Sequence, residues 1–206
     1  MNRTALTLAA AALIATGSAI AQQSQPEQAA PAAQTTPNQP ATTINDRRDN
    51  QQDRIANGIG SGQLTAGETK NLEGREANLN REIKDDRQGD DGKLTGQERQ
   101  QINRQQNHLS RSIYTDKHNA ATAHYGNNEV GARRENQQDR IANGIRNGSM
   151  TAGQAARDEN REQGINEQIH ADRQGNGGKL TGQEKGQINR QQNRMSGTIY
   201  RQKHSK

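Results

Sequence analysis

Acidic side chains gather in one short stretch of the chain, and their carboxylates offer the first chemistry that the sequence suggests. The four candidates are Asp86, Asp90, Asp91 and Glu98. Carboxylate oxygens are the ligands that calcium prefers in proteins. The stretch therefore predicts a divalent-cation site with Ca²⁺ as the bound ion.

The turn within this stretch recurs at four places, each with a Gly, an apolar residue, a Thr and then Glu or Gln at fixed spacing. The turns begin at Gly62, Gly92, Gly148 and Gly178. This spacing resembles the second half of an EF-hand loop, which implies a helix-turn-helix pair with calcium ligands at six loop positions. The first halves depart from that pattern, because the first ligand position is Asn57, Arg87, Asn143 or Arg173.

The same residues have a second explanation that needs no metal. A Thr followed three residues later by Glu or Gln forms a capping box, in which each side chain bonds to the other residue's backbone amide at a helix start. The four pairs are Thr65 and Glu68, Thr95 and Glu98, Thr151 and Gln154, and Thr181 and Glu184. Because these pairs persist in all four turns and the full ligand set persists in none, the sequence favours helix starts and keeps calcium as the alternative.

A second group of reactive residue types ends each half of the chain, where a Tyr and a His stand four residues apart on one helix face. In the second half the candidate anion-binding group is Tyr200, Arg201, Lys203 and His204. A transition metal is an alternative if His108 or His170 lies nearby. A simple helix C-terminus, whose Lys and His complement the helix dipole, explains the same residues.

Motifs for enzyme catalysis are missing from the sequence. There is no Cys, no His-Glu-x-x-His pair, no Gly-x-Ser-x-Gly elbow and no Gly-rich phosphate loop. We therefore expect no enzymatic activity. An enzyme would require Tyr114, His118 and a carboxylate to meet in one pocket.

The composition is very polar and the charges are mixed. The 206 residues carry 28 basic and 23 acidic side chains, for a net charge of +5. Residues 130–206 hold 14 of the basic residues against 8 acidic ones, so this half is the expected anion-facing surface. Three Tyr and no Trp or Phe give little surface for stacking bases, so we expect no nucleic acid. An anionic envelope polymer or self-association is the expected partner.

The N-terminus predicts export. Residues 1–21 have a basic residue near the start, an apolar run and a final Ala-Ile-Ala, as in a secretory signal peptide. Residues 22–43 contain all four prolines among Gln, Ala and Thr, which is typical of a disordered linker. No later stretch is apolar enough to span a bilayer, so we expect a periplasmic or secreted protein without a transmembrane segment.

An internal repeat organises the remainder. The ten residues from Asn50 to Ile59 return unchanged from Asn136 to Ile145, an offset of 86 residues. The sequence therefore predicts an all-α fold made by tandem duplication, with copies at 44–129 and 130–206. Each copy is expected to be a three-helix unit with EF-hand-like helix-turn-helix pairs, and in the first copy the helices are expected at about 47–57, 66–86 and 96–117.

The apolar positions of the second helix form a narrow stripe of Leu72, Leu79 and Ile83. In the second copy Asp158 stands at the position of Leu72. We therefore expect that helix to pack least tightly.

Three motifs carry a resemblance: Arg-Ile-x-x-Gly from Arg54, Leu-Thr-x-x-Glu from Leu64, and Gln-Asn-x-x-Ser-x-x-Ile-Tyr from Gln106. With these motifs the chain resembles uncharacterised, exported proteobacterial helical-repeat proteins. The resemblance implies location and architecture rather than an activity. The expected function is an interaction or structural role in the cell envelope, with calcium binding through a degenerate EF-hand-like loop as the alternative.

Overall fold

The computed structural model describes residues 43–205 and shows an all-helical fold. The predicted signal peptide and nearly all of the predicted linker lie outside the described residues. Six helices follow one another: α1 (Ile44–Gly60), α2 (Ala66–Gly89), α3 (Gly96–Lys117), α4 (Glu129–Arg146), α5 (Ala152–Gly175) and α6 (Gly182–His204). The described residues contain no strand, so the predicted all-α class is confirmed.

Both ends of the first helix differ from the prediction. Helix α1 begins earlier because Thr43 forms a capping box with Asp46, in which the Thr43 hydroxyl accepts from the Asp46 amide at 3.1 Å. The predicted end of this helix near residue 57 is wrong, since the helix continues to Gly60. Gly58 instead makes room for Leu64, because a Cβ at Gly58 would lie only 2.6 Å from the Leu64 Cδ1 atom.

The four recurring turns share one backbone geometry. Each of α2, α3, α5 and α6 begins with a Thr N-cap and a complete capping box. The glycine ahead of each cap has a positive φ, of 70° at Gly62, 83° at Gly92, 69° at Gly148 and 86° at Gly178. Glycine suits these positions because side chains disfavour left-handed backbone.

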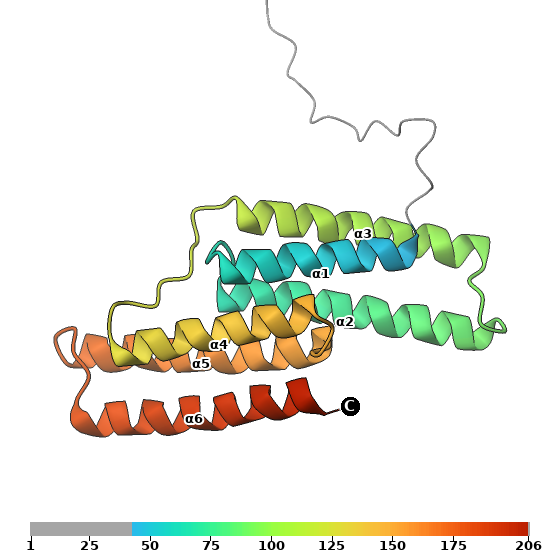
Figure 1. The fold of residues 1–206 in the computed structure, drawn as a ribbon. Helices are drawn as coiled ribbons and strands as arrows, with labels where there is room; N and C mark the ends of the chain where they lie inside the picture. Colours follow the sequence, from blue (N-terminus) through green and yellow to red (C-terminus); the bar gives the residue numbers. More distant parts are fainter. Residues whose placement is uncertain (1–42, 206) are drawn as a thin grey trace, which may run out of the picture. The chain divides into compact units, whose positions relative to one another are not determined.

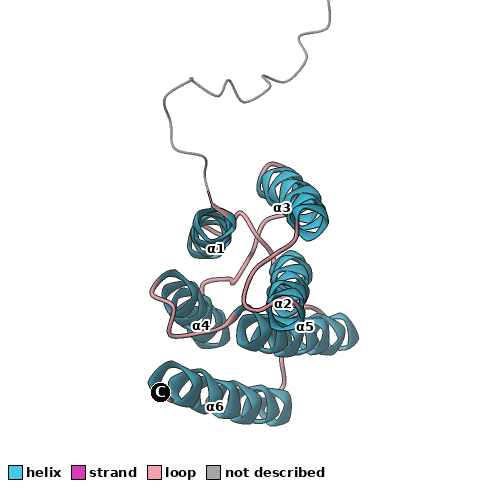
Figure 2. Cartoon of the chain, turned by 90° about the vertical axis from the view of Figure 1, so that its right-hand side faces the viewer, coloured by secondary structure: helices cyan, strands magenta, loops and turns pink. Residues whose placement is uncertain are grey.

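Each half of the chain is an up-down-up set of three helices, and the two sets pack through their first two helices (Figure 1). Helix α2 lies against α5 in the most extensive helix contact, and α1 lies against α4. The end-on view of Figure 2 places α3 and α6 on opposite sides of these central helices. The α2–α5 contact, called the seam below, therefore joins the two halves.

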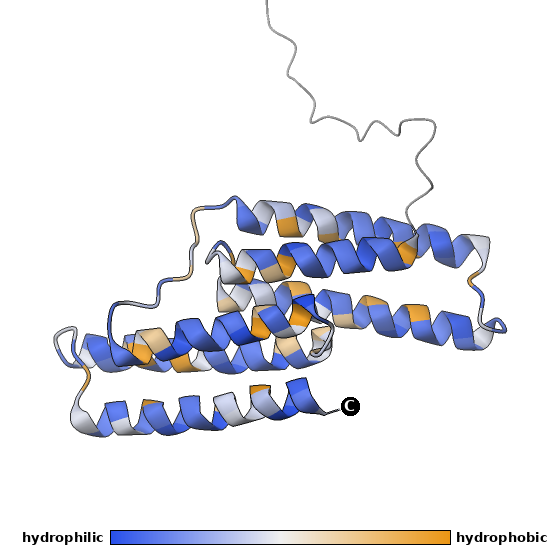
Figure 3. Cartoon of the chain, in the orientation of Figure 1, coloured by the Kyte–Doolittle hydropathy of each residue, from blue (hydrophilic) through white to orange (hydrophobic). Residues whose placement is uncertain are grey.

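The apolar core is continuous across the seam. Its largest cluster takes Ile55 and Ile59 from α1 together with Ile141 and Ile145 from α4. The predicted stripe of α2 is buried. In Figure 3 the apolar residues form narrow patches on helices that are otherwise hydrophilic, which agrees with a thin core. Within residues 43–205 no helix combines the length and apolar character that crossing a membrane requires.

Candidate binding surface and buried carboxylate layer

An open trough runs over the outer side of the seam. It has a volume of about 880 Å³ and takes its lining from α2 and α5. Its charged lining residues are Lys70, Arg75, Arg157 and Arg161. All four are cationic, and no acidic side chain lines the trough among the described residues. Three asparagines, Asn71, Asn78 and Asn160, add amide groups to the same surface.

Neighbouring residues hold three of the four cations in place. Lys70 Nζ donates to Gln163 Oε1 at 3.2 Å across the seam, and Arg75 Nη1 donates to Ser112 Oγ at 2.8 Å. Arg161 Nη1 lies 2.7 Å from Asp158 Oδ1. The side chain of Arg157 is exposed. Because each half of the chain supplies two cations, the trough exists only when the halves are packed together.

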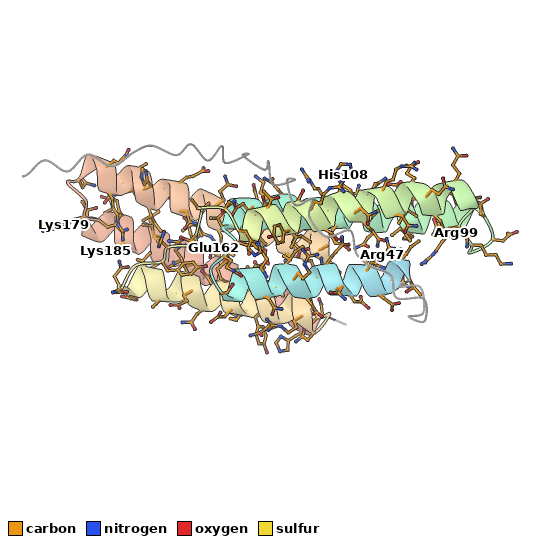
Figure 4. All side chains as sticks on the ribbon, turned by 90° about the horizontal axis from the view of Figure 1, so that it is seen from above. Arg47, Arg99, His108, Glu162, Lys179 and Lys185 are labelled. Carbon is orange, nitrogen blue, oxygen red and sulfur yellow. The ribbon has the colours of Figure 1, made fainter. Side chains whose placement is uncertain are left out.

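Beneath the trough, the seam buries acidic side chains. Glu73, Glu76, Asp158 and Glu159 are 0% exposed and Glu162 is 1% exposed. Figure 4 places Glu162 inside the bundle near its middle, whereas Lys179 and Lys185 lie towards one end and Arg99 towards the other. Helices α2 and α5 each pack against helices of their own half and against each other. In an isolated three-helix unit the acidic face of such a helix would be in contact with water, whereas here it is buried.

The buried glutamates have matching partners in the two halves. Glu73 Oε2 accepts from Gln52 Nε2 at 3.2 Å, and Glu159 Oε2 accepts from Gln138 Nε2 at 3.0 Å. Two weaker ion pairs sit beside them, Arg48 with Glu76 and Arg134 with Glu162, each with the arginine Nε 3.7 Å from the carboxylate. One oxygen of Glu73 and one of Glu159 have no hydrogen-bond partner among the described residues.

Burial raises the pKa of these acids because it penalises the charged carboxylate. The pKa of Glu73 rises to about 8. The pKa values of Glu76 and Glu162 rise to about 7, with Arg48 and Arg134 opposing the effect of burial. The pKa of Glu159 is raised well above its ordinary value by burial, with further contributions from the charges of Glu162 and Glu73. The seam therefore holds carboxyl groups that take up protons near neutral pH.

The predicted cation-binding residues lie at the turn between α2 and α3. The charge of Glu98, followed by burial, raises the pKa of Asp90, because the two carboxyl groups lie near each other. Glu98 also accepts from the Thr95 amide at 2.7 Å, as the capping box requires. Asp86 is close enough for Glu98 and Asp90 to contribute to the rise in its pKa, after burial, while Asp91 is exposed with a φ of 52°.

The second half makes the same turn contact with different chemistry. Asn176 stands at the position of Asp90, and its Nδ2 donates to Glu184 Oε1 at 2.7 Å. An amide donates this bond without a proton from solution, whereas Asp90 needs one. Across residues 43–205 no three His, Asp or Glu side chains form a group that could hold a metal ion.

The predicted anion-binding residues sit at the end of α6. Tyr200 stacks on His204 with ring centroids 4.1 Å apart, and the His204 ring nitrogen lies 2.7 Å from the Tyr200 carbonyl oxygen. Arg201 is exposed, whereas Lys203 is half-buried with its stem near Gly144 of α4. The four residues thus divide between two helix faces.

Tyr114 and His118 stack in the same way at the end of α3, with ring centroids 4.1 Å apart. Tyr114 is 61% exposed, so the pair lies on the surface rather than in an enclosed site. His108 is exposed on α3 and His170 is exposed on α5. Neither residue belongs to a group that could hold a metal ion within the part of the chain that the structure describes.

Sequence reasoning missed both the trough cations and the buried glutamates. One signal pointed to the latter: the pair Glu73 and Glu76 recurs unchanged as Glu159 and Glu162. An acidic pair that recurs next to an apolar stripe indicates that the pair has the same surroundings in both halves. The trough left a partial signal: Arg75 recurs as Arg161, whereas Lys70 and Arg157 align with Ala156 and Asn71.

Comparisons with known proteins give no family assignment. No protein-family model matches the sequence, and no curated protein or solved structure matches it either.

Proposed function

We propose that this chain is an exported, non-enzymatic helical protein that binds an anionic polymer of the cell envelope across the seam. The observation that carries the proposal is the trough of about 880 Å³ with four cationic side chains and no acidic lining residue among those described. The predicted export signal and the resemblance to exported repeat proteins support the expected location.

The chemistry of the trough suits a polymer better than a small anion. Its cations are spread over two helices instead of converging on one point, so several separate negative charges can be met at once. The guanidinium groups of Arg75, Arg157 and Arg161 can pair bidentately with carboxylate or phosphate. Neighbouring asparagine amides can bond to the hydroxyl groups of a sugar chain.

The trough changes the expectation, drawn from composition, of where the anion binds. The basic excess of residues 130–206 predicts that the second half is the anion-facing surface. The trough instead takes Lys70 and Arg75 from α2 and Arg157 and Arg161 from α5. Binding should therefore require the packed, two-part fold.

Calcium binding at the turn between α2 and α3 is the second candidate. It is favoured by the closeness of two acids, Asp90 and Glu98, because a cation between them would offset the repulsion that raises the pKa of Asp90. It ranks below polymer binding because the described side chains form no ready group of metal ligands.

The proposal is tested by titrating the mature chain, residues 22–206, with polygalacturonate and with polyphosphate. Binding should weaken steeply as salt rises from about 0.05 to 0.3 M, because salt screens exposed charges. Monomeric galacturonate and inorganic phosphate are the matched controls and should bind far more weakly. Absence of binding to both polymers at low salt would refute the proposal.

A further inference from the structure

The cationic trough and the buried acids beneath it belong to the same contact between α2 and α5. Along α2, the trough residue Arg75 stands between the buried Glu73 and Glu76. The aligned residue of α5 is Arg161, whose Nη1 atom lies 2.7 Å from Oδ1 of the buried Asp158. A movement that parts α2 from α5 therefore changes both. The buried acids, called the carboxyl layer below, are Glu73, Glu76, Asp158, Glu159 and Glu162.

The carboxyl layer is short of hydrogen-bond donors. Several of its buried oxygens have no hydrogen-bond partner within residues 43–205, namely Glu73 Oε1, Glu76 Oε1 and Oε2, Asp158 Oδ2, Glu159 Oε1 and Glu162 Oε1. A protonated carboxyl group is neutral and tolerates this, whereas an ionised carboxylate that is buried without donors costs much free energy. Close packing of α2 against α5 is therefore favourable only while the layer holds protons.

The charged and titratable groups that face the layer compensate its acids only in part. They are Arg48 and Asp49 of α1, Arg134 of α4, Arg157 and Arg161 of α5, and Tyr125 of the connection before α4. The guanidinium groups of Arg48 and Arg134 stay 3.7 Å from their glutamates, which is too far for a hydrogen bond. Asp49 adds a negative charge near Glu76. Ion pairing therefore does not cancel the cost of burying these carboxylates.

The layer loses its protons in a pH range where the trough keeps its charge. The pKa of Glu73 is raised to about 8 and those of Glu76 and Glu162 to about 7, in each case chiefly by burial. Lysine and arginine side chains stay cationic across the same range. Within the described residues no histidine or carboxyl group lines the trough. A dependence of polymer binding on pH in this range therefore reports on the packing of α2 against α5.

From this arrangement we infer that protons in the carboxyl layer control polymer binding at the trough. While the layer is protonated the trough is assembled, and when the layer ionises, water enters between α2 and α5 and the trough comes apart. The inference rests on the proposed polymer binding. Each half keeps only two of the four cations when the seam opens, so the apparent affinity falls with the fraction of closed molecules. By the same linkage, a bound polymer favours proton uptake by the layer.

A disulfide across the seam separates its opening from every other effect of pH. A Cβ atom added at Gly153 of α5 would lie 3.8 Å from the Cβ atom of Ala77 of α2, which is a separation that disulfides adopt. The sequence has no Cys that could interfere. Oxidised Ala77→Cys with Gly153→Cys should therefore hold α2 on α5 at any pH. The matched control is Ala77→Ser with Gly153→Ser, which has side chains of similar size and cannot cross-link.

The affinity of the mature chain for polygalacturonate is measured at pH 6 and pH 9 at the same low salt concentration, where the carboxylates of the polymer are ionised at both pH values. We expect the parent and the serine control to bind roughly ten-fold more weakly at pH 9, and the cross-linked variant to change less than about two-fold. A second variant, Glu73→Gln with Glu159→Gln, needs no cross-link and should recover part of the affinity that the parent loses.

Three results would overturn the inference. They are equal affinity of the parent at both pH values, the same loss in the cross-linked variant as in the serine control, and no recovery in the glutamine variant. The cross-linked variant and the serine control share all histidines and the amino terminus, so a loss common to both would come from those groups rather than from the seam. Lack of binding at pH 6 would instead refute polymer binding itself.

Discussion

Glu73 of α2 and Glu159 of α5 lie close enough across the seam for the charge of Glu73 to raise the pKa of Glu159, after the larger effects of burial and of the Glu162 charge. Both side chains are 0% exposed, and each is bonded to a glutamine from its own half. Two buried carboxyl groups that lie near each other are rarely ionised together, because their negative charges repel. The seam is therefore most stable when at least one of them is protonated.

We predict that the protein is more stable in mild acid than in base. The pKa values of Glu73, Glu76 and Glu162 rise in the fold from about 4.5 to about 8, 7 and 7. The folded state therefore holds more protons than the unfolded chain between pH 4.5 and 8, and stability falls as pH rises through that window. Urea unfolding at pH 5 and pH 8 should differ by roughly 3 kcal/mol or more.

The double variant Glu73→Gln with Glu159→Gln should reduce this dependence, leaving the part that Glu76 and Glu162 contribute, and should raise stability at pH 8. Glutamine has the shape of a protonated glutamic acid and can still accept from Gln52 or Gln138. The control is Glu135→Gln, which removes an exposed carboxylate and should leave the slope unchanged. A change of stability between pH 5 and pH 8 that is as large in the double variant as in the parent would count against this origin.

At the α2–α3 turn, Asp90→Asn should raise the melting temperature at pH 8. The amide would donate to Glu98 as Asn176 does to Glu184, without needing a proton. As the pH falls and Asp90 itself takes up a proton, the difference in melting temperature between the variant and the parent should shrink. If calcium raises the melting temperature of the parent but not of Asp90→Asn, a cation rather than a proton bridges the two carboxylates.

Asp158→Leu should stabilise the protein by about 1–3 kcal/mol at pH 7. It replaces a 0% exposed carboxylate with the residue found at the aligned Leu72, and exchanging buried charges for packed apolar groups is often favourable. Arg161 loses its partner, but its side chain is 50% exposed and can be hydrated. Thermal melts at pH 7 measure the change, and a destabilised variant would show that the Arg161 contact outweighs burial of the carboxylate.

Much of the fold follows from local patterns in the sequence. The Thr–Glu and Thr–Gln pairs mark helix starts because the capping bonds they form span only three residues. The stripe of Leu72, Leu79 and Ile83 marks the buried face of α2, since helical periodicity fixes which positions align. The predicted end of α1 was wrong because Gly58 does not end the helix. A glycine stands there because Leu64 packs against it and leaves no room for a side chain.

The candidate site could not be predicted in the same way because it forms between the halves. Glu73 and Glu76 look like solvated residues until α5 covers α2, and Asp158 looks like a defect until it is seen beside Arg161. Likewise, Lys70 and Arg157 gather in one trough only through antiparallel packing of α2 and α5. Periodicity along one helix says nothing about which second helix will cover it.

The most direct measurement of polymer binding is isothermal titration of polygalacturonate into the mature chain with two matched double variants. Arg75→Gln with Arg157→Gln removes two trough cations, and we predict at least five-fold weaker binding at low salt. Arg104→Gln with Arg111→Gln removes the same charge from exposed positions of α3 and should change affinity less than two-fold. Equal losses in both variants would contradict a binding site at the seam and leave only a general effect of net charge.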